Sequence, residues 1–217
     1  MQQYSSIPVE PTGANDNSDE PWVPKEPKKW RNALSTIAII VAAPLIALFL
    51  TAFVFQSYEV DGPSMETTLQ NQDRLIVWKV PKTISKLTRN PYIPKRDDVI
   101  VFNKQSSFET GAFDKQLIKR VIGLPGDRVL VQDGRITIYN AEHPDGFNPD
   151  EGHDYSGNIA PITSGNIDIE VGDGEVFVCG DNRTNSLDSR AFGTISSHEI
   201  VGKLALRIFP VQNFKSF

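Results

Sequence analysis

The chain has 217 residues, 39% of them hydrophobic, and a formal net charge of −5. This length allows one membrane span plus one domain with its own core, and it excludes two large domains. The acidic balance argues against a nucleic-acid-binding protein, which needs a basic surface.

The first segment, residues 1–33, is predicted to be a disordered tail. It is polar and repeatedly interrupted by proline, at Pro8, Pro11, Pro21, Pro24 and Pro27. Such a composition buries too little apolar surface to offset the conformational entropy lost on folding.

Residues 34–55 are predicted to form a single transmembrane helix. They contain no charged residue, and Trp30 and Tyr58 flank them as interfacial aromatic residues would. A helix of this length rises about 33 Å, close to the ~30 Å hydrocarbon core of a bilayer. The length argues against a buried core helix. No small-x-small site follows, so we expect an uncleaved signal anchor and not a removable signal peptide.

The charges beside this segment predict its orientation. Four basic residues precede it, and none follows until Arg74; the four are Lys25, Lys28, Lys29 and Arg31. The positive-inside rule then places the N-terminus in the cytoplasm and residues 56–217 outside.

Residues 56–217 are predicted to form a mainly antiparallel β domain. Short runs rich in β-branched and aromatic residues alternate with turn residues, at 74–78, 98–102, 135–139, 175–178 and 204–209. The stretch 140–165 is rich in Gly, Pro, Asp and Asn, and we expect an inserted loop or small cap there. Its histidines, His143 and His153, match no metal-ligand spacing, so we predict no metal site.

The single cysteine, Cys179, ends an apolar run and is predicted to be a small buried hydrophobic residue. Because the chain has only this one cysteine, an internal disulfide is excluded. None of the three histidines lies in a cysteine-protease motif, which argues against a catalytic thiol.

One lysine lies in an unusually apolar setting. Lys119 is surrounded in the sequence by Leu117, Ile118, Val121 and Ile122. It could be an edge-strand lysine whose ammonium reaches water. Alternatively, its apolar neighbours desolvate it and lower its pKa, so that the neutral amine can act as a base.

Three further segments carry candidate functional residues. The first is 62–69, GPSMETTL, with Ser64 in a Gly/Pro turn. The second is 180–193, GDNRTNSLDSRAFG, whose interleaved aspartates and arginines indicate an ion-paired loop. The third, Asp73 to Val77, begins a strand. Each alone is compatible with an ordinary turn or strand.

Together with Lys119 and the turn GLPGD at 123–127, these segments resemble the bacterial type I signal peptidase family. They occur in the family's order, from the hydrophobic anchor to the long box at 180–193, and the resemblance covers residues 34–209. The combination is specific because several boxes agree at once. It implies an N-terminal membrane anchor followed by an antiparallel β catalytic domain.

The resemblance also implies roles for individual residues. Ser64 stands where the family has its nucleophile and Lys119 where it has its general base. Ser186 matches a serine that orients the lysine. The remaining matches support the site or the loop, namely Asp188, Arg190, Arg120, Asp181 and Asn182.

The sequence departs from the family pattern at two positions near Ser64. Thr67 stands where the family commonly has proline. Gly62 stands where some members have a serine whose hydroxyl helps form the oxyanion hole. We therefore expect the oxyanion hole to use the backbone N–H of Ser64 and a second donor, either the N–H of Gly62 or another group.

The implied function is a membrane-bound serine endopeptidase of the bacterial cell membrane. It would remove signal peptides from secretory preproteins through a Ser64 acyl-enzyme, after Ala-x-Ala type sites, with the bilayer as its other partner. No cofactor, metal or nucleic acid is expected. Two alternatives remain, a catalytically inactive relative and a membrane-anchored β-rich binding module. A soluble Ser-Lys repressor is disfavoured by the anchor and the acidic charge.

Overall fold

The computed structural model describes residues 29–66, 68–104, 115–152, 159 and 162–217. Most of the predicted tail, 1–28, therefore lies outside the described residues, as do Thr67 and His153. The chain divides into two compact units, Met1–Pro44 and Leu45–Phe217.

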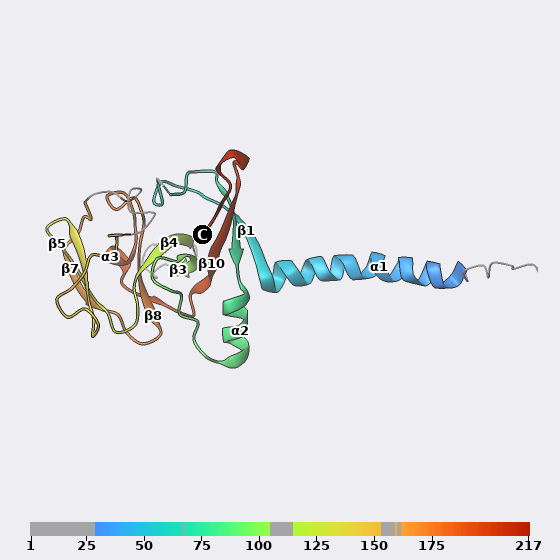
Figure 1. The fold of residues 1–217 in the computed structure, drawn as a ribbon, viewed down its shortest axis with the longest axis horizontal. Coiled ribbons are helices and arrows are strands. Elements are labelled where there is room, and N and C mark those ends of the chain that lie inside the picture. Colours follow the sequence, from blue (N-terminus) through green and yellow to red (C-terminus); the bar gives the residue numbers. More distant parts are fainter. Residues whose placement is uncertain (1–28, 67, 105–114, 153–158, 160–161) are drawn as a thin grey trace, which may run out of the picture. The chain divides into compact units, whose positions relative to one another are not determined.

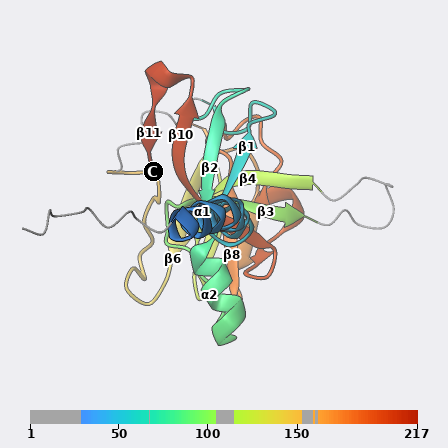
Figure 2. The same ribbon diagram turned by 90° about the vertical axis from the view of Figure 1, so that its right-hand side faces the viewer.

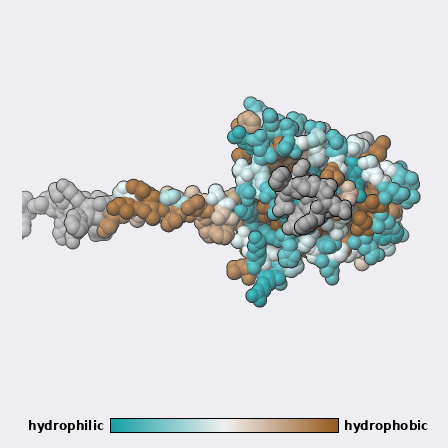
Figure 3. All heavy atoms as spheres, turned by 180° about the vertical axis from the view of Figure 1, so that it is seen from behind, coloured by the Kyte–Doolittle hydropathy of each residue, from teal (hydrophilic) through white to brown (hydrophobic). Residues whose placement is uncertain are grey.

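A long helix precedes the β domain. It consists of α1 (Lys29–Phe49) and a π-helical turn, η1 (Leu50–Val54). The stretch Leu34–Val54 is long and apolar enough to cross a membrane, and its side chains are exposed (Figure 3). The boundaries differ from the predicted ones. The helix begins at Lys29, inside the segment predicted to be disordered, and Phe55 is already the first residue of a strand.

The main sheet of the second unit has eight strands, all paired antiparallel (Figures 1 and 2). Its order is β1-β2-β10-β3-β4-β8-β9, and β11 pairs with β10. The strands are β1 (Phe55–Glu59), β2 (Arg74–Trp78), β3 (Val99–Lys104), β4 (Lys115–Gly123), β8 (Glu175–Cys179), β9 (Ile195–Ser196), β10 (Ile200–Phe209) and β11 (Lys215–Ser216).

A second, smaller sheet has the order β6-β5-β7. Its strands are β5 (Arg128–Gln132), β6 (Arg135–Tyr139) and β7 (Ile167–Glu170). The buried side chains of β5 and β6 form one apolar cluster with Phe177 and Cys179 of β8. Between these strands, the described part of 140–165 consists of turns and bends, with one bridge between Phe147 and Ile138.

Three short helices complete the described structure: α2 (Val80–Thr88), α3 (Ser189–Phe192) and the 3-10 turn η3 (Val211–Asn213). Helix α2 was not predicted. Its signal was the helical spacing of Val80, Ile84 and Leu87, together with a proline in the first turn.

The predicted fold class is confirmed, because the second unit is mainly antiparallel β and follows an apolar N-terminal helix. One detail was wrong. Tyr58 was expected at a membrane interface, but it lies in β1 and packs against the core cluster that contains Leu75 and Leu204.

Candidate active site

Ser64 lies in a tight turn between β1 and β2. Gly62 takes a positive φ of 105°, which glycine adopts without strain, and Glu66 N–H donates to the Pro63 carbonyl. The next side chain, Met65, is fully buried in the core. Burial of Met65 holds the turn against the sheet and leaves Ser64 half-buried beside it.

Lys119 reaches Ser64 from the middle of the sheet. It lies on β4, opposite Ile100 of β3, and only 3% of its surface is exposed. Its Nζ lies 2.7 Å from Ser64 Oγ and 2.9 Å from the Ile118 carbonyl oxygen. The two residues are 55 positions apart in the sequence, and the fold brings their side chains into hydrogen-bond contact.

The surroundings of Lys119 favour its neutral form. Burial lowers the pKa of the ammonium to about 8, although the charges of Asp188 and Asp181 oppose this shift. Lys203 shows the contrasting case of a lysine whose charge is compensated, because its Nζ lies 2.6 Å from an Asp98 carboxylate oxygen. Of the two sequence interpretations, the desolvated lysine is therefore correct, and the lysine that reaches water is not.

The loop 180–193 holds the Ser64 turn from the other side. Asn182 donates its backbone N–H to the Ser64 carbonyl at 3.1 Å and its side-chain amide to the Pro63 carbonyl at 3.2 Å. Gly180 allows this close approach, since a Cβ there would lie 2.3 Å from the Ser64 carbonyl oxygen. The sequence pointed to a structural role for Asn182 but not to this direct contact.

Three buried ion pairs fix the loop. Arg190 binds Asp188 through two hydrogen bonds of 2.8 and 2.7 Å, and Asp188 also accepts the Gly180 N–H at 2.9 Å. Burial raises the pKa of Asp188, but Arg190 outweighs it and the pKa lies below its usual value. The other pairs are Arg120 with Asp181 and Arg183 with Asp150. The loop is thus ion-paired as predicted, although two of its charges pair with residues outside it.

Ser186 lies close to the site and beside Asp188, whose pKa its hydroxyl helps to lower, although the two side chains do not meet in hydrogen-bond geometry. A Cβ on Gly180 would lie 2.3 Å from Ser186 Oγ, which places this hydroxyl beside the Ser64 turn. The hydroxyl is buried and has no hydrogen-bond partner among the described residues. The predicted hydrogen bond between Ser186 and Lys119 is thus not formed in this structure.

The two expected oxyanion donors differ in whether their N–H groups are already hydrogen-bonded. The N–H of Ser64 makes no hydrogen bond within the described chain. The N–H of Gly62 donates to Asn71 Oδ1 at 3.0 Å and is therefore already engaged. Gly62 was one candidate for the second donor, and nothing in the sequence indicated that Asn71 would fold back to accept its N–H.

A groove of about 450 Å³ opens beside Ser64 and Lys119. It runs between β1 and β4 and is lined mainly by Tyr58, Glu59, Val60, Gln116, Leu117 and Ile118. Cys179 does not line it. As expected, Cys179 is fully buried, and burial raises the pKa of its thiol far above the usual value.

Comparisons with known proteins identify the family of the chain. Residues 33–209 match the family model described as signal peptidase, peptidase S26. A probable signal peptidase I-2 of Synechocystis is 32% identical over 79% of this chain and 71% of its own length. Signal peptidase I P of Bacillus subtilis subsp. natto is 31% identical over 88% of this chain and 97% of its own. A signal peptidase I crystal structure from Enterococcus faecalis is 26% identical, covers 52% of this chain and 97% of that one, and aligns with a TM-score of 0.38.

Proposed function

Because the chain belongs to the signal peptidase family, peptidase S26, we propose that it removes signal peptides from exported preproteins by a Ser64/Lys119 mechanism. The observation that carries this proposal is the 2.7 Å contact between Lys119 Nζ and Ser64 Oγ. It joins a nucleophile to a buried amine whose pKa is lowered to about 8. A Ser-Lys pair is a known variant of the nucleophile-and-base arrangement.

The proposed reaction begins with neutral Lys119. Its amine takes the proton from the Ser64 hydroxyl as Oγ attacks the scissile carbonyl carbon. The protonated lysine then gives this proton to the leaving amine, the peptide bond breaks, and an ester to Ser64 remains. Water, deprotonated by the same amine, hydrolyses the ester and restores both side chains.

The Ser64 N–H, which has no partner among the described residues, is the best placed donor for the developing oxyanion. In other acyl-transfer enzymes, losing one such donor costs about 3 kcal/mol of transition-state stabilisation. The clamp of Asn182 on the Pro63 and Ser64 carbonyls supports this assignment, because it fixes the orientation of the peptide groups on either side of Ser64.

The groove between β1 and β4 suits an extended substrate. A strand laid there would place alternate side chains in the groove, and shallow pockets would favour small residues, as in Ala-x-Ala sites. We further propose that Leu34–Val54 anchors the chain in the membrane, with the catalytic domain outside.

Cleavage of a preprotein tests the proposal. The full-length chain would be purified in detergent beside Ser64→Ala and Lys119→Met, with Lys95→Met as a control at an exposed lysine. The substrate is a preprotein whose signal peptide ends in Ala-x-Ala, and mass spectrometry reads the new N-terminus. We expect cleavage after the second alanine by the wild type and the control only.

Other results would decide between the alternatives. Cleavage that survives Ser64→Ala would show that Ser64 is not the nucleophile. A folded wild type that binds the preprotein but never cleaves it would support the binding module or the inactive relative.

A further inference from the structure

The segment around α2 carries an unusual concentration of positive charge. Residues 74–96 contain seven basic residues and no acidic one, in a chain whose net charge is −5. Four of the seven lie on or beside α2, namely Lys79, Lys82, Lys86 and Arg89. This charge plays no part in the proposed peptidase chemistry.

Helix α2 is bonded directly to the end of the apolar helix. Lys79 N–H donates to the Val54 carbonyl at 2.8 Å, and Thr83 Oγ1 donates to the Phe53 carbonyl at 3.0 Å. If Leu34–Val54 crosses the bilayer, its last turn lies at the membrane surface and α2 lies there with it. Trp78, 41% exposed just before α2, fits the same depth.

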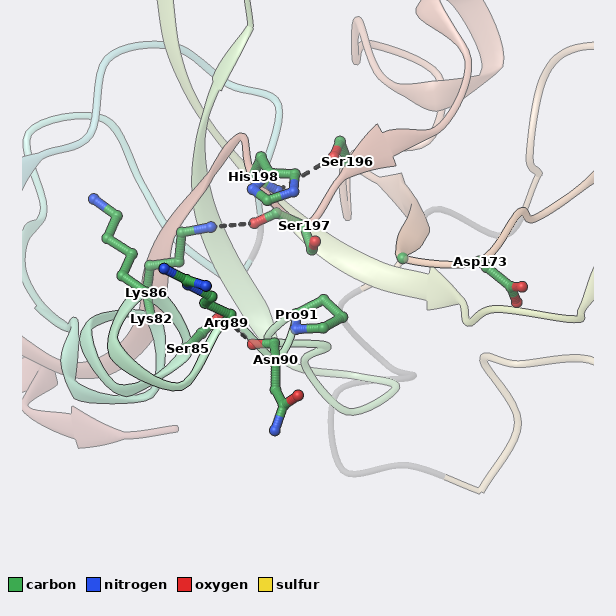
Figure 4. Close-up of a pocket in the computed structure, with 11 residues that line it drawn as sticks. Lys82, Ser85, Lys86, Arg89, Asn90, Pro91, Asp173, Ser196, Ser197 and His198 are labelled. Carbon is green, nitrogen blue, oxygen red and sulfur yellow. Dashed lines mark hydrogen bonds between the residues drawn. The ribbon is translucent and has the colours of Figure 1, made fainter.

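A hollow of about 640 Å³ opens between α2 and the turn that follows β9 (Figure 4). Lys82, Lys86 and Arg89 line it together with His198, and Asp173 is the only acidic residue among its described lining residues. The lining therefore carries a net positive charge, which suits an anionic group.

Lys82 is the buried member of this group. It is 8% exposed, and within the described chain its ammonium is bonded only to the Ser197 carbonyl oxygen, with no carboxylate. Burial lowers the pKa of Lys82, and the charge of Lys86 lowers it further. A bound anion would offset both effects.

A second hollow, of about 700 Å³, adjoins the first along α2 and is partly apolar. It is lined by Phe53, Ile84 and Leu87, and it shares Lys82, Lys86 and His198 with the first. Ile84 and Leu87 are 53% and 84% exposed. A basic hollow adjoining one that also exposes apolar side chains matches a phospholipid, whose headgroup phosphate continues into acyl chains.

We propose that α2 and the turn 196–198 form a binding site for an anionic phospholipid at the extracytoplasmic surface of the bilayer that Leu34–Val54 crosses. Lys82, Lys86 and Arg89 bind the headgroup phosphate, while Phe53, Ile84 and Leu87 contact the acyl chains. A zwitterionic lipid is disfavoured because its cationic group would meet the same basic side chains. This inference rests on the proposed anchoring but not on the proposed catalytic chemistry.

Native mass spectrometry of the full-length chain tests the site. The protein would be released from detergent micelles that contain equal amounts of phosphatidylglycerol and phosphatidylcholine. The pocket variant is Lys86→Gln/Arg89→Gln, both exposed positions, and the control with the same charge change is Lys95→Gln/Arg135→Gln. Each cation near an anionic surface contributes about a fivefold preference, so we expect the pocket variant to retain phosphatidylglycerol at least about tenfold less.

Leu87→Gln and inorganic phosphate distinguish a lipid from a free anion. For a lipid, Leu87→Gln also lowers phosphatidylglycerol retention, and equimolar inorganic phosphate does not displace it. Full displacement by phosphate, equal retention of the two lipids by the wild type, or equal retention by the pocket and control variants would each overturn the proposal. Cleavage of a soluble peptide by the pocket variant should equal that of the wild type, which separates this test from that of the peptidase function.

Discussion

Lys119 carries a stability cost that its proposed role explains. Its ordinary pKa is 10.5 and burial lowers it to about 8, so at pH 7 the folded protein holds a charged ammonium in a poorly solvated place. Between about pH 8 and 10.5 the unfolded chain binds more protons than the folded one, and stability therefore rises with pH across this window. The buried lysine is thus least favourable for folding at every pH below about 8.

We expect Lys119→Met to be inactive but more stable than the wild type at pH 7, by roughly 1–3 kcal/mol. Methionine fills a similar volume without a charge. The gain should shrink as the pH rises from 8 to 10.5, because the wild type loses its penalty there. Thermal unfolding at pH 7 and pH 10 measures this. A variant less stable than the wild type at both values would contradict the desolvation argument.

Ser186→Ala should show whether Ser186 positions the catalytic groups or only contributes to stability. Among the described residues the buried Ser186 hydroxyl accepts or donates no hydrogen bond of good geometry, so its removal costs little stability. Because it lies beside the Ser64 turn, we expect cleavage to fall at least about tenfold, with the loss in kcat and not in KM. The control is Ser189→Ala, which removes the acceptor of the Val178 N–H and should lower stability by about 1 kcal/mol. Unchanged cleavage by Ser186→Ala would remove it from the site.

At the scale of elements, the described part of the insertion is tied to the active-site loop by one ion pair. Arg183 is fully buried and binds Asp150 through two side-chain hydrogen bonds, and it also reaches Thr163 and the Gly180 carbonyl. Through Gly180, this pair supports the segment that lies against Ser64.

Replacing one partner of the Arg183–Asp150 pair should lower the unfolding free energy far more than replacing both partners. Asp150→Leu leaves a buried cation unpaired, and we expect a loss of about 3–5 kcal/mol in unfolding free energy. The double variant Arg183→Leu/Asp150→Leu should recover part of this loss, as measured by denaturant unfolding. The exposed pair Arg128–Asp168 is the control, and Arg128→Leu should leave the unfolding midpoint nearly unchanged. Additive losses in the double variant would show that the two side chains are not coupled.

The sequence predicted elements well where the signal was local. The strands β2, β6 and β8 coincide closely with β-branched runs, and β3 and β10 extend beyond theirs. Helix α2 was missed because nine residues with a proline and two lysines give a weak helical pattern. The separate sheet β6-β5-β7 was missed because strand pairing across the insertion is a long-range property.

The difference between local signals and long-range contacts also applies to the site. Ser64 and Lys119 could be singled out because each lies in a recognisable box, and the fold brings their side chains into contact. The bond from Gly62 to Asn71 and the pairing of Arg183 with Asp150 join segments with no shared sequence signal. These two contacts form only once the chain has folded, and no local sequence pattern predicts them.

For the whole molecule, the apolar helix predicts a single-pass membrane protein. We expect the full-length chain to stay in the pellet after alkaline extraction of bacterial membranes. In spheroplasts, external protease should digest the domain 56–217 while an N-terminal tag stays protected. Release of the chain by alkali would contradict the anchor, and digestion of the tag would contradict the orientation.

The central claim is that neutral Lys119 activates Ser64, and the pH dependence of kcat/KM tests it most directly. This ratio reports the pKa of essential groups in the free enzyme. For a peptide with an Ala-x-Ala site, we predict a tenfold rise per pH unit at low pH, a half-maximal value near the Lys119 pKa of about 8, and a plateau above it. A profile already flat from about pH 6, or one that is half-maximal near 10.5, would contradict the claim.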